Sequence, residues 1–162
     1  MQSYDPYEIM LVPPNKKSEM IVEEICKGAG ANLNLVRDLI TLWANLDWQD
    51  NNSGRTALHV CAYKNQPEIL RMLIHAGADV NIQDYDGWTA LHWCTRSNQP
   101  EIAKMLIDAG ADVNIQDNIT DRTALHMSQD WRHIEIYRML ILAGADKTIK
   151  RKHLLFQYTG DL

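Results

Sequence analysis

The chain repeats itself with a period of 33 to 34 residues, and this period constrains its fold more than any other feature of the sequence. The sequence Thr-Ala-Leu-His occurs three times, at residues 56–59, 89–92 and 123–126. A different sequence, Gly-Ala-Asp, occurs with the same offsets, at residues 77–79, 110–112 and 144–146. Two separate motifs that share one period indicate a protein assembled from copies of a single structural unit.

Each unit predicts two short helices joined by a tight turn. In the first copy, Thr56 is placed to cap the start of a helix that extends through about Lys64. Asn65 follows where the chain must turn, and Asn tolerates the left-handed backbone conformation. Pro67 suits the first turn of a second helix, and Gly77 suits the position just past its end.

The second helix of each unit carries apolar residues along one face. In the first copy these residues are Ile69, Leu70, Leu73 and Ile74. A single helix pair cannot bury such a face alone, whereas stacked pairs bury it against one another. The stretch that follows Gly77 predicts an extended segment and a tight turn before the next Thr. The pattern therefore predicts a one-dimensional solenoid.

These residues resemble the ankyrin repeat, whose pattern carries Thr-Pro-Leu-His-x-Ala in the first helix and Gly-Ala-Asp after the second. The resemblance covers residues 47–149, with Ala in place of the family's Pro in all three copies. The third copy diverges most, with Arg132 at the usual Gly or Asn turn and a longer tip at 118–122 that lacks Gly. The resemblance implies an all-α solenoid of stacked helix-turn-helix units with short β-hairpin or turn fingers.

The domain organisation follows from the same alignment. We expect a single ankyrin-repeat domain at 18–162, preceded by an N-terminal arm at 1–17 without a helical pattern. The parts of the domain are a degenerate cap repeat at 18–46 whose first helix is 19–27, repeats at 53–82, 86–115 and 120–149, and a tail at 150–162. The tail either covers the exposed face of the last repeat or marks the chain as a piece of a longer protein.

Composition and net charge disfavour several classes of function and location. The net charge of −5 over 162 residues disfavours sequence-blind binding to nucleic acid or anionic lipid. No apolar run approaches the roughly 18 residues of a membrane span. Three cysteines without Cys-x-x-Cys spacing disfavour a disulfide framework and a zinc site. We expect a monomer in the reducing cytoplasm, with a nuclear location or secretion as an effector left open.

The histidines and cysteines follow the repeat, which argues against catalysis. His59, His92 and His126 occupy equivalent positions on neighbouring units, about 10 Å apart at the usual helix-packing distance, whereas zinc ligands lie near 2 Å from one metal. The resemblance implies that these histidines hydrogen-bond within and between repeats. Cys61 and Cys94 occupy the family's small-residue position and predict buried fillers. We expect no enzyme, no metal and no cofactor.

The positions that vary between copies predict a binding function. In ankyrin proteins the finger tips and the exposed side of the first helix form a concave groove that holds a partner protein. The chain has five Trp and one Phe, and three of those Trp map to that face with Tyr and Arg, the residue types enriched in binding hot spots. The predicted partner-binding residues are Tyr63, Tyr85, Asp86, Trp88, Trp93, Arg96, Arg122, Asp130 and Trp131.

Several alternatives stay open at this stage. The same aromatic residues would serve packing within their own repeats, or would hold a small ligand, a nucleotide or a short RNA. The chain would also fit a regulatory ankyrin segment of a larger protein. Asn81 and Asn114 resemble ankyrin sites modified by asparaginyl hydroxylases. Trp43 and Trp48 fall in the cap repeat and its hairpin, where packing is the default expectation.

Overall fold

The computed structural model describes residues 6–152, and this part of the chain contains nine α-helices, one 3₁₀ turn and no β-strand. Residues 1–5 of the expected arm and 153–162 of the expected tail lie outside the described residues. The elements are α1 (Pro6–Met10), α2 (Pro14–Cys26), η1 (Gly28–Gly30), α3 (Leu33–Thr41), α4 (Ala57–Lys64), α5 (Pro67–His75), α6 (Ala90–Arg96), α7 (Pro100–Asp108), α8 (Ala124–Asp130) and α9 (Ile134–Leu142).

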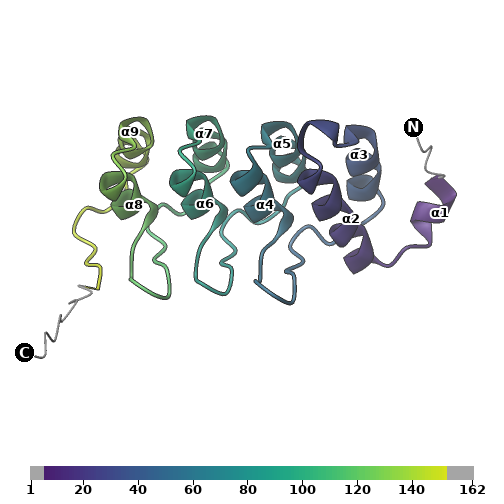
Figure 1. Cartoon of the computed structure of the whole chain (residues 1–162), viewed down its shortest axis with the longest axis horizontal. Helices are drawn as coiled ribbons and strands as arrows, with labels where there is room; N and C mark the ends of the chain where they lie inside the picture. Colours follow the sequence, from purple (N-terminus) through teal and green to yellow (C-terminus); the bar gives the residue numbers. More distant parts are fainter. Residues whose placement is uncertain (1–5, 153–162) are drawn as a thin grey trace, which may run out of the picture.

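The helices form two layers, as the repeat predicts (Figure 1). The first helices of the units, α2, α4, α6 and α8, pack against one another in order, and the second helices, α3, α5, α7 and α9, do the same. Three finger-like loops project from one side of the row, next to the first helices. We call the fingers together with the exposed sides of α2, α4, α6 and α8 the inner surface.

The local signals in the sequence set the helix boundaries. Thr56 and His59 form a reciprocal capping box at the start of α4. Asn65 ends that helix in the left-handed conformation with a φ of 56°. Pro67 begins α5, where its missing N–H is harmless, and Gly77 follows the helix with a φ of 91°. These four predictions are confirmed.

The core lies between the two layers and between successive units. Ile69, Leu70 and Leu73 of α5 are fully buried, as the apolar face predicts. Burying a side chain of this size contributes about 1.5–3 kcal/mol relative to exposure. Cys61 and Cys94 are fully buried as well, and the prediction that they are packing residues is confirmed.

Side-chain amides and carboxylates hydrogen-bond neighbouring units to one another at the same place in each repeat. The Asp79 N–H donates to Asp47 (2.9 Å), and the Asp112 N–H donates to Asn81 Oδ1 (2.7 Å). Asn114 Oδ1 accepts from the next unit in the same way. Asn81 and Asn114 therefore have a structural role, and their hydroxylation stays a prediction.

The N-terminal segment differs from the expected arm. Residues 6–10 are helical, and α2 begins at Pro14 rather than at the expected residue 19. Pro14 occupies the first turn of the helix, where proline is favoured. Ile9 is 3% exposed, and Lys17 donates to the Leu42 carbonyl (2.7 Å). Because these residues pack on the cap repeat, the described part of 1–17 is not an irregular arm.

Trp43 also departs from expectation. Its side chain is 84% exposed, although packing was the default expectation for this residue. Trp43 follows α3 with a φ of 69°, as Gly77 follows α5 with a φ of 91°. The left-handed end of the helix directs the side chain away from the core.

Candidate functional site

Each finger is a closed turn built around an aspartate. In the second finger the Asp84 N–H donates to the Trp88 carbonyl (2.8 Å), which closes the loop. The Asp84 carboxylate accepts from the N–H groups of Asp86 (3.1 Å) and Trp88 (2.8 Å). Asp50 and Asp117 close the first and third fingers in the same way. The backbone of each finger tip is therefore fixed before any partner arrives.

The fingers also stack on one another. The Tyr85 N–H donates to the Ser53 carbonyl of the preceding finger (3.0 Å), and the Asn118 N–H donates to Asp86 (2.9 Å). The Tyr85 ring lies against Gly54, where an added Cβ would stand 2.3 Å from a ring carbon. Gly54 has a φ of 70°, so both its conformation and this close approach require glycine. Tyr85 remains 60% exposed at the tip.

Three aromatic side chains meet where the second finger joins α4 and α6. The ring centroids of Trp88 and Trp93 are 4.9 Å apart, and Tyr63 meets Trp93 edge-on at 5.5 Å. The Trp93 indole N–H donates to the buried Asp84 carboxylate (2.9 Å). Trp93 is only 5% exposed, so its ring packs against and supports the side chains around it. Its assignment as a partner-binding residue stays a prediction.

Three cations surround these rings. The Arg55 guanidinium lies 4.1 Å from the centroid of Trp93, and that of Arg96 lies 5.5 Å from Trp88 and from Trp93. Lys64 Nζ lies 5.5 Å from the centroid of Tyr63. We call this group the central cluster, which consists of Arg55, Tyr63, Lys64, Trp88, Trp93 and Arg96. It joins four of the predicted partner-binding residues to two neighbouring cations of the same face, Arg55 and Lys64.

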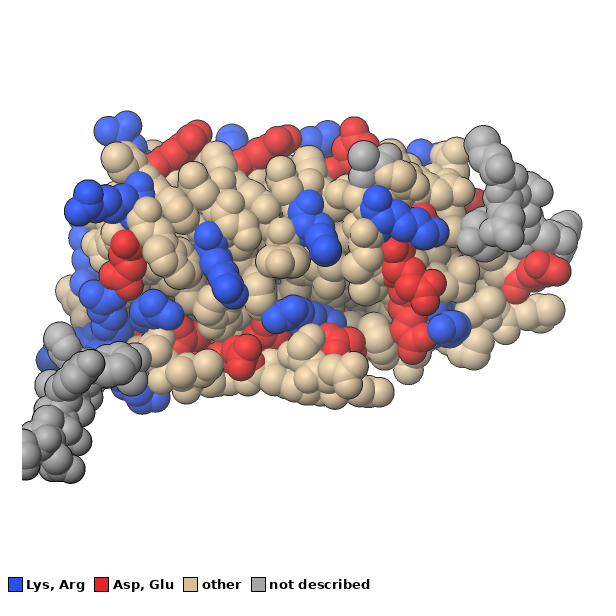
Figure 2. Space-filling view, in the orientation of Figure 1, with Lys and Arg blue, Asp and Glu red and all other residues tan. Residues whose placement is uncertain are grey.

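Three other predicted residues, Arg122, Asp130 and Trp131, lie at the third unit, whereas Tyr85 and Asp86 lie at the tip of the second finger. Arg151 donates to both oxygens of Asp130 (2.8 and 2.6 Å), and Arg122 lies 3.6 Å from the same carboxylate. Trp131 is 39% exposed at the end of α8. We call Arg122, Asp130 and Arg151 the C-terminal cluster. It lies at the end of the molecule where Lys and Arg side chains gather (Figure 2).

The sequence analysis missed two residues of the site. Asp84 was passed over because it precedes the variable tip, although its equivalence to Asp50 and Asp117 was a usable signal. Arg151 falls in the expected tail at 150–162, and only the fold brings it to Asp130.

The periodic histidines connect each unit to the next finger. His59 Nδ1 accepts from the Thr56 N–H (3.0 Å), which leaves Nε2 to donate to the Trp88 carbonyl (2.9 Å). His92 and His126 repeat this arrangement. Burial lowers the pKa of His92 to about 4, so its ring is neutral at pH 7. The structural role implied for these histidines is confirmed.

The cysteines of the core are not poised as nucleophiles. Burial raises the pKa of Cys94 to about 12 and that of Cys61 still further, so both stay thiols at neutral pH. Within residues 6–152, no three side chains of the metal-ligating types come together as a metal site would need. None of the helices in that part is long and apolar enough to cross a membrane.

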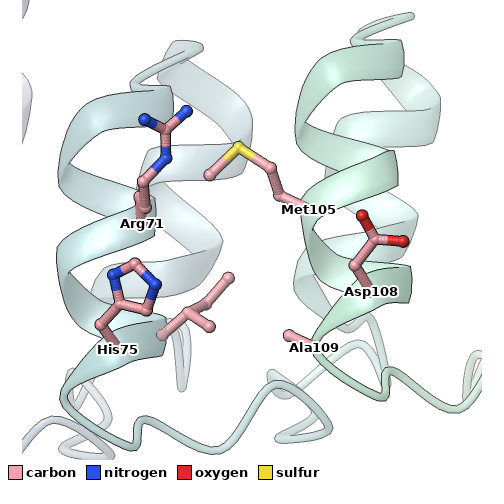
Figure 3. Close-up of a pocket in the computed structure, with 6 residues that line it drawn as sticks. Arg71, His75, Met105, Asp108 and Ala109 are labelled. Atoms are coloured by element: carbon pink, nitrogen blue, oxygen red, sulfur yellow. The ribbon is translucent and has the colours of Figure 1, made fainter.

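Two surface hollows lie on opposite layers of the solenoid. One, with a volume of about 360 Å³, lies on the inner surface between α2, the first finger and α4, and Val22, Val60 and Lys64 are among its lining residues. The other, of about 350 Å³, lies between the outer helices α5 and α7 (Figure 3). Arg71 and His75 line its α5 side, and Asp108 lines its α7 side without an ion pair to either. Of these two hollows, the inner one adjoins the central cluster.

The solenoid and its finger-bearing surface define the class of protein. A family model described as ankyrin repeats, in three copies, matches residues 24–117, which is more than half of the chain. The chain therefore belongs to the ankyrin-repeat family. The matched region includes the cap repeat's second helix and the whole central cluster.

Similar proteins share short segments with this chain. Protein phosphatase 1 regulatory subunit 12B of Homo sapiens is 57% identical over 42 residues, and subunit 12A of Mus musculus is 60% identical over 42 residues. In each case the matched segment is 26% of this chain and 4% of the relative. Ankyrin repeat and SOCS box protein 6 of Homo sapiens is 46% identical over 41 residues, which is 25% of this chain and 10% of that protein.

Proposed function

We propose that the chain is a non-catalytic module that holds a partner protein on its inner surface. Ankyrin repeats are protein-interaction modules, and the repeats here leave their variable residues on the fingers and first helices. The observation that carries the proposal is the central cluster, which combines aromatic rings and cations on rigid elements. Trp, Tyr and Arg dominate binding hot spots because they bury a large area and add directional polar contacts.

The direct contacts are assigned to the exposed members of the surface. Tyr63 is 50% exposed and Tyr85 60% exposed, and Arg96 and Asp86 are exposed as well. Trp88 is half-buried and offers one edge. Because the stacked fingers and helices need little ordering on binding, most of the interaction energy is available for affinity.

The similar proteins favour a regulatory or adaptor role. Two are named as regulatory subunits of a phosphatase and one as a SOCS box protein, and each contains the matched segment within a longer chain. We therefore place this chain among adaptor, inhibitor or effector proteins, or as a regulatory segment of a larger protein. We expect it in the cytoplasm, where exposed Cys26 stays reduced.

A nucleotide or RNA sensor is the weaker alternative. Bases stack on open aromatic faces, whereas the Trp93 ring is 5% exposed and contacts Trp88, Tyr63, Arg55 and Arg96. The net charge of −5 also opposes a phosphate backbone.

The test compares two double variants in a pull-down from lysate of the source cell, with captured proteins identified by mass spectrometry. Tyr63→Ala/Tyr85→Ala truncates the exposed aromatics of the inner surface. Trp43→Ala/Leu142→Ala truncates two side chains that are 84% and 88% exposed elsewhere. We expect a protein captured by the wild type and the second variant to be lost from the first.

Circular dichroism and urea unfolding establish that both variants are folded before the comparison is made. Equal capture by all three proteins would contradict the inner surface as the binding site. Loss with the Trp43→Ala/Leu142→Ala variant alone would move the site to the exposed residues at the ends of α3 and α9.

A further inference from the structure

We propose that the inner surface takes an acidic segment of its partner protein, whose carboxylates bind Lys64 and Arg96. The proposal rests on the proposed function and adds the chemistry of the partner. It is carried by a difference between the cations on and near the inner surface: Arg55, Arg122, Arg151 and Lys152 each pair with a carboxylate of this chain, whereas Lys64 of α4 and Arg96 of α6 do not.

The neutralised cations lie in the first and third fingers and in the segment after α9. Arg55 lies 3.7 Å from the buried Asp84 carboxylate, and Arg122 lies 3.7 Å from Asp117. Arg151 and Lys152 pair with Asp130 and Asp121 respectively, at 2.6 and 2.9 Å. A partner's carboxylate would have to displace these internal partners, so these cations are poor candidates for recognition.

Lys64 and Arg96 are different. Neither forms an ion pair within residues 6–152, and both side chains are exposed. Both are held instead against aromatic rings, Lys64 against Tyr63 and Arg96 against Trp88 and Trp93. Such cation–π contacts orient a charged group without neutralising it. The two cations are thus positioned for an anion that this part of the chain does not supply.

The spacing of these cations defines the acidic segment further. Lys64 ends α4 and Arg96 ends α6, and Tyr63 and Trp93 connect them through three successive separations of 5.5 Å. Neighbouring packed helices lie about 10 Å apart, and an extended peptide advances about 3.3 Å per residue. Because side chains of an extended peptide alternate faces, the carboxylates that reach both cations belong to residues about two to four positions apart.

The inner hollow provides a site for an apolar side chain beside them. Val22 and Val60 contribute apolar walls, Lys64 lies at the same hollow, and its volume is about 360 Å³. Asp50 also lines it, but the Asp50 carboxylate is already bound by Ser53 and by the N–H of Arg55. The hollow therefore fits an apolar residue of an acidic segment rather than another cation.

A peptide fits this surface better than RNA. The Trp93 ring offers no free face for a base, because it is 5% exposed and Trp88, Arg55 and Arg96 lie against it. The exposed carboxylate of Asp86 stands on the second finger and would repel a phosphate carried by every nucleotide. A peptide places its few charges only where the two free cations are.

The experiment selects peptides from a random twelve-residue phage library on the immobilised wild-type chain. We expect enriched clones to carry Asp or Glu about two to four positions apart beside an apolar residue. The best clone is then made as a fluorescein-labelled peptide, and its dissociation constant is measured by anisotropy for the wild type and two variants. Lys64→Ala/Arg96→Ala removes the free cations, and Arg71→Ala/Arg138→Ala removes two exposed cations from the outer helices α5 and α9.

We expect the first variant to bind the peptide at least about tenfold more weakly, since it loses the charge-assisted hydrogen bonds to the peptide's carboxylates. The second variant makes the same change in net charge, and we expect its affinity to stay within about twofold of the wild type. Replacing the peptide's Glu and Asp by Gln and Asn should abolish the difference between the variants.

Three results would overturn the proposal, and they are distinguishable from one another. Neutral peptides that are lost on Tyr63→Ala/Tyr85→Ala would contradict the acidic chemistry and leave the proposed function intact. Clones that bind all variants equally would contradict both the acidic-segment proposal and the proposed function. Tighter binding of a fluorescein-labelled ten-nucleotide uridine RNA than of the selected peptide would assign the surface to nucleic acid.

Discussion

The central cluster and the C-terminal cluster occupy equivalent places on neighbouring units, yet they handle charge in opposite ways. In the central cluster, Arg96 is stacked on two indole rings and has no carboxylate partner among residues 6–152. In the C-terminal cluster, the equivalent position is Asp130, which binds both Arg122 and Arg151. The same repeat scaffold therefore carries one cluster in which a cation lacks a carboxylate partner and one in which the cations are paired.

This difference separates the structural residues of the site from the binding ones. Charges that are satisfied internally hold the fingers to the helices, whereas charges that are only oriented are free to bind a partner. The predictions below test that separation through stability, pH and salt.

The largest effect is expected from Asp84→Ala. The substitution leaves the indole N–H of Trp93 and the N–H of Trp88 without their acceptor and Arg55 without its counter-charge. Leaving a buried hydrogen-bond donor without its acceptor typically costs about 1–3 kcal/mol. Urea unfolding should show a loss in this range, with Asp86→Ala, an exposed neighbour, within about 0.5 kcal/mol of the wild type.

Asp117→Ala makes the equivalent change in the third finger. Asp117 accepts from Thr120 and from backbone N–H groups but from no indole, and its partner Arg122 keeps Asp130 as a second carboxylate. We therefore expect a smaller loss than for Asp84→Ala. Equal losses would contradict the view that Asp84 holds the central cluster together.

Lowering the pH should reduce the stability of the folded chain through protonation of His92. The pKa of this ring is about 4 in the folded chain and 6.5 ordinarily, because burial penalises the charged form. The neutral ring's contribution is fully present above pH 6.5 and is lost as pH falls toward 4. Between pH 7.5 and 4.5 we expect the wild type to lose about 2 kcal/mol more than His92→Gln.

His126 serves as the internal control for that measurement. It is only partly buried at the end of the solenoid, and burial lowers its pKa by less than that of fully buried His92. Urea unfolding of His126→Gln across the same pH range should therefore remove less of the acid sensitivity. The reverse order would be inconsistent with burial as the cause.

Arg132→Gly should stabilise the third unit. Arg132 has a φ of 58°, where the first two units have Asn65 and Asn98, and side chains other than Gly and Asn are strained there. The gain should be about 1 kcal/mol in urea unfolding, because glycine adopts this conformation without strain. Asn98→Gly, in the second unit, should change stability less, and an equal gain would speak against strain at Arg132.

The smallest expected effect is a difference between the two clusters in how salt changes the stability cost of a substitution. Arg151→Ala removes an exposed ion pair with Asp130, which is worth about 0–1 kcal/mol at low salt. In 1 M NaCl, where screening acts over about 3 Å, we expect this cost to vanish. Arg96→Ala removes a stacked guanidinium, and its cost of about 0.5–1 kcal/mol should change less with salt. Thermal melts at both salt concentrations test the contrast.

The fold was predictable because every local signal recurs with the repeat. The Thr and His of the capping box, the turn at Asn65 and the helix start at Pro67 each act over a few residues, so their spacing alone indicates the structure. The start of α2 was missed because Pro14, which begins this helix as Pro67 begins α5, lies outside the repeated pattern. Contacts such as that of Lys17 with Leu42 hold the helix in place.

The sequence predicted where the site lies on the fold but not which of its side chains are buried. Sequence equivalence placed Trp93 on the exposed side of α6, and the burial of its ring follows from neighbours on other units, Arg55 and Tyr63. The pairing of Arg151 with Asp130 joins residues 21 apart, outside any local pattern. Which cations are free is therefore a property of the assembled surface.

The most direct test of the account is an amide hydrogen-exchange footprint of the chain with and without its captured partner. The account predicts slower exchange in the first two fingers and along α4 and α6, with the outer helices α5 and α7 unchanged. Slower exchange confined to α5, α7 or α9 would place the partner on the opposite layer and contradict the inner surface as the binding site.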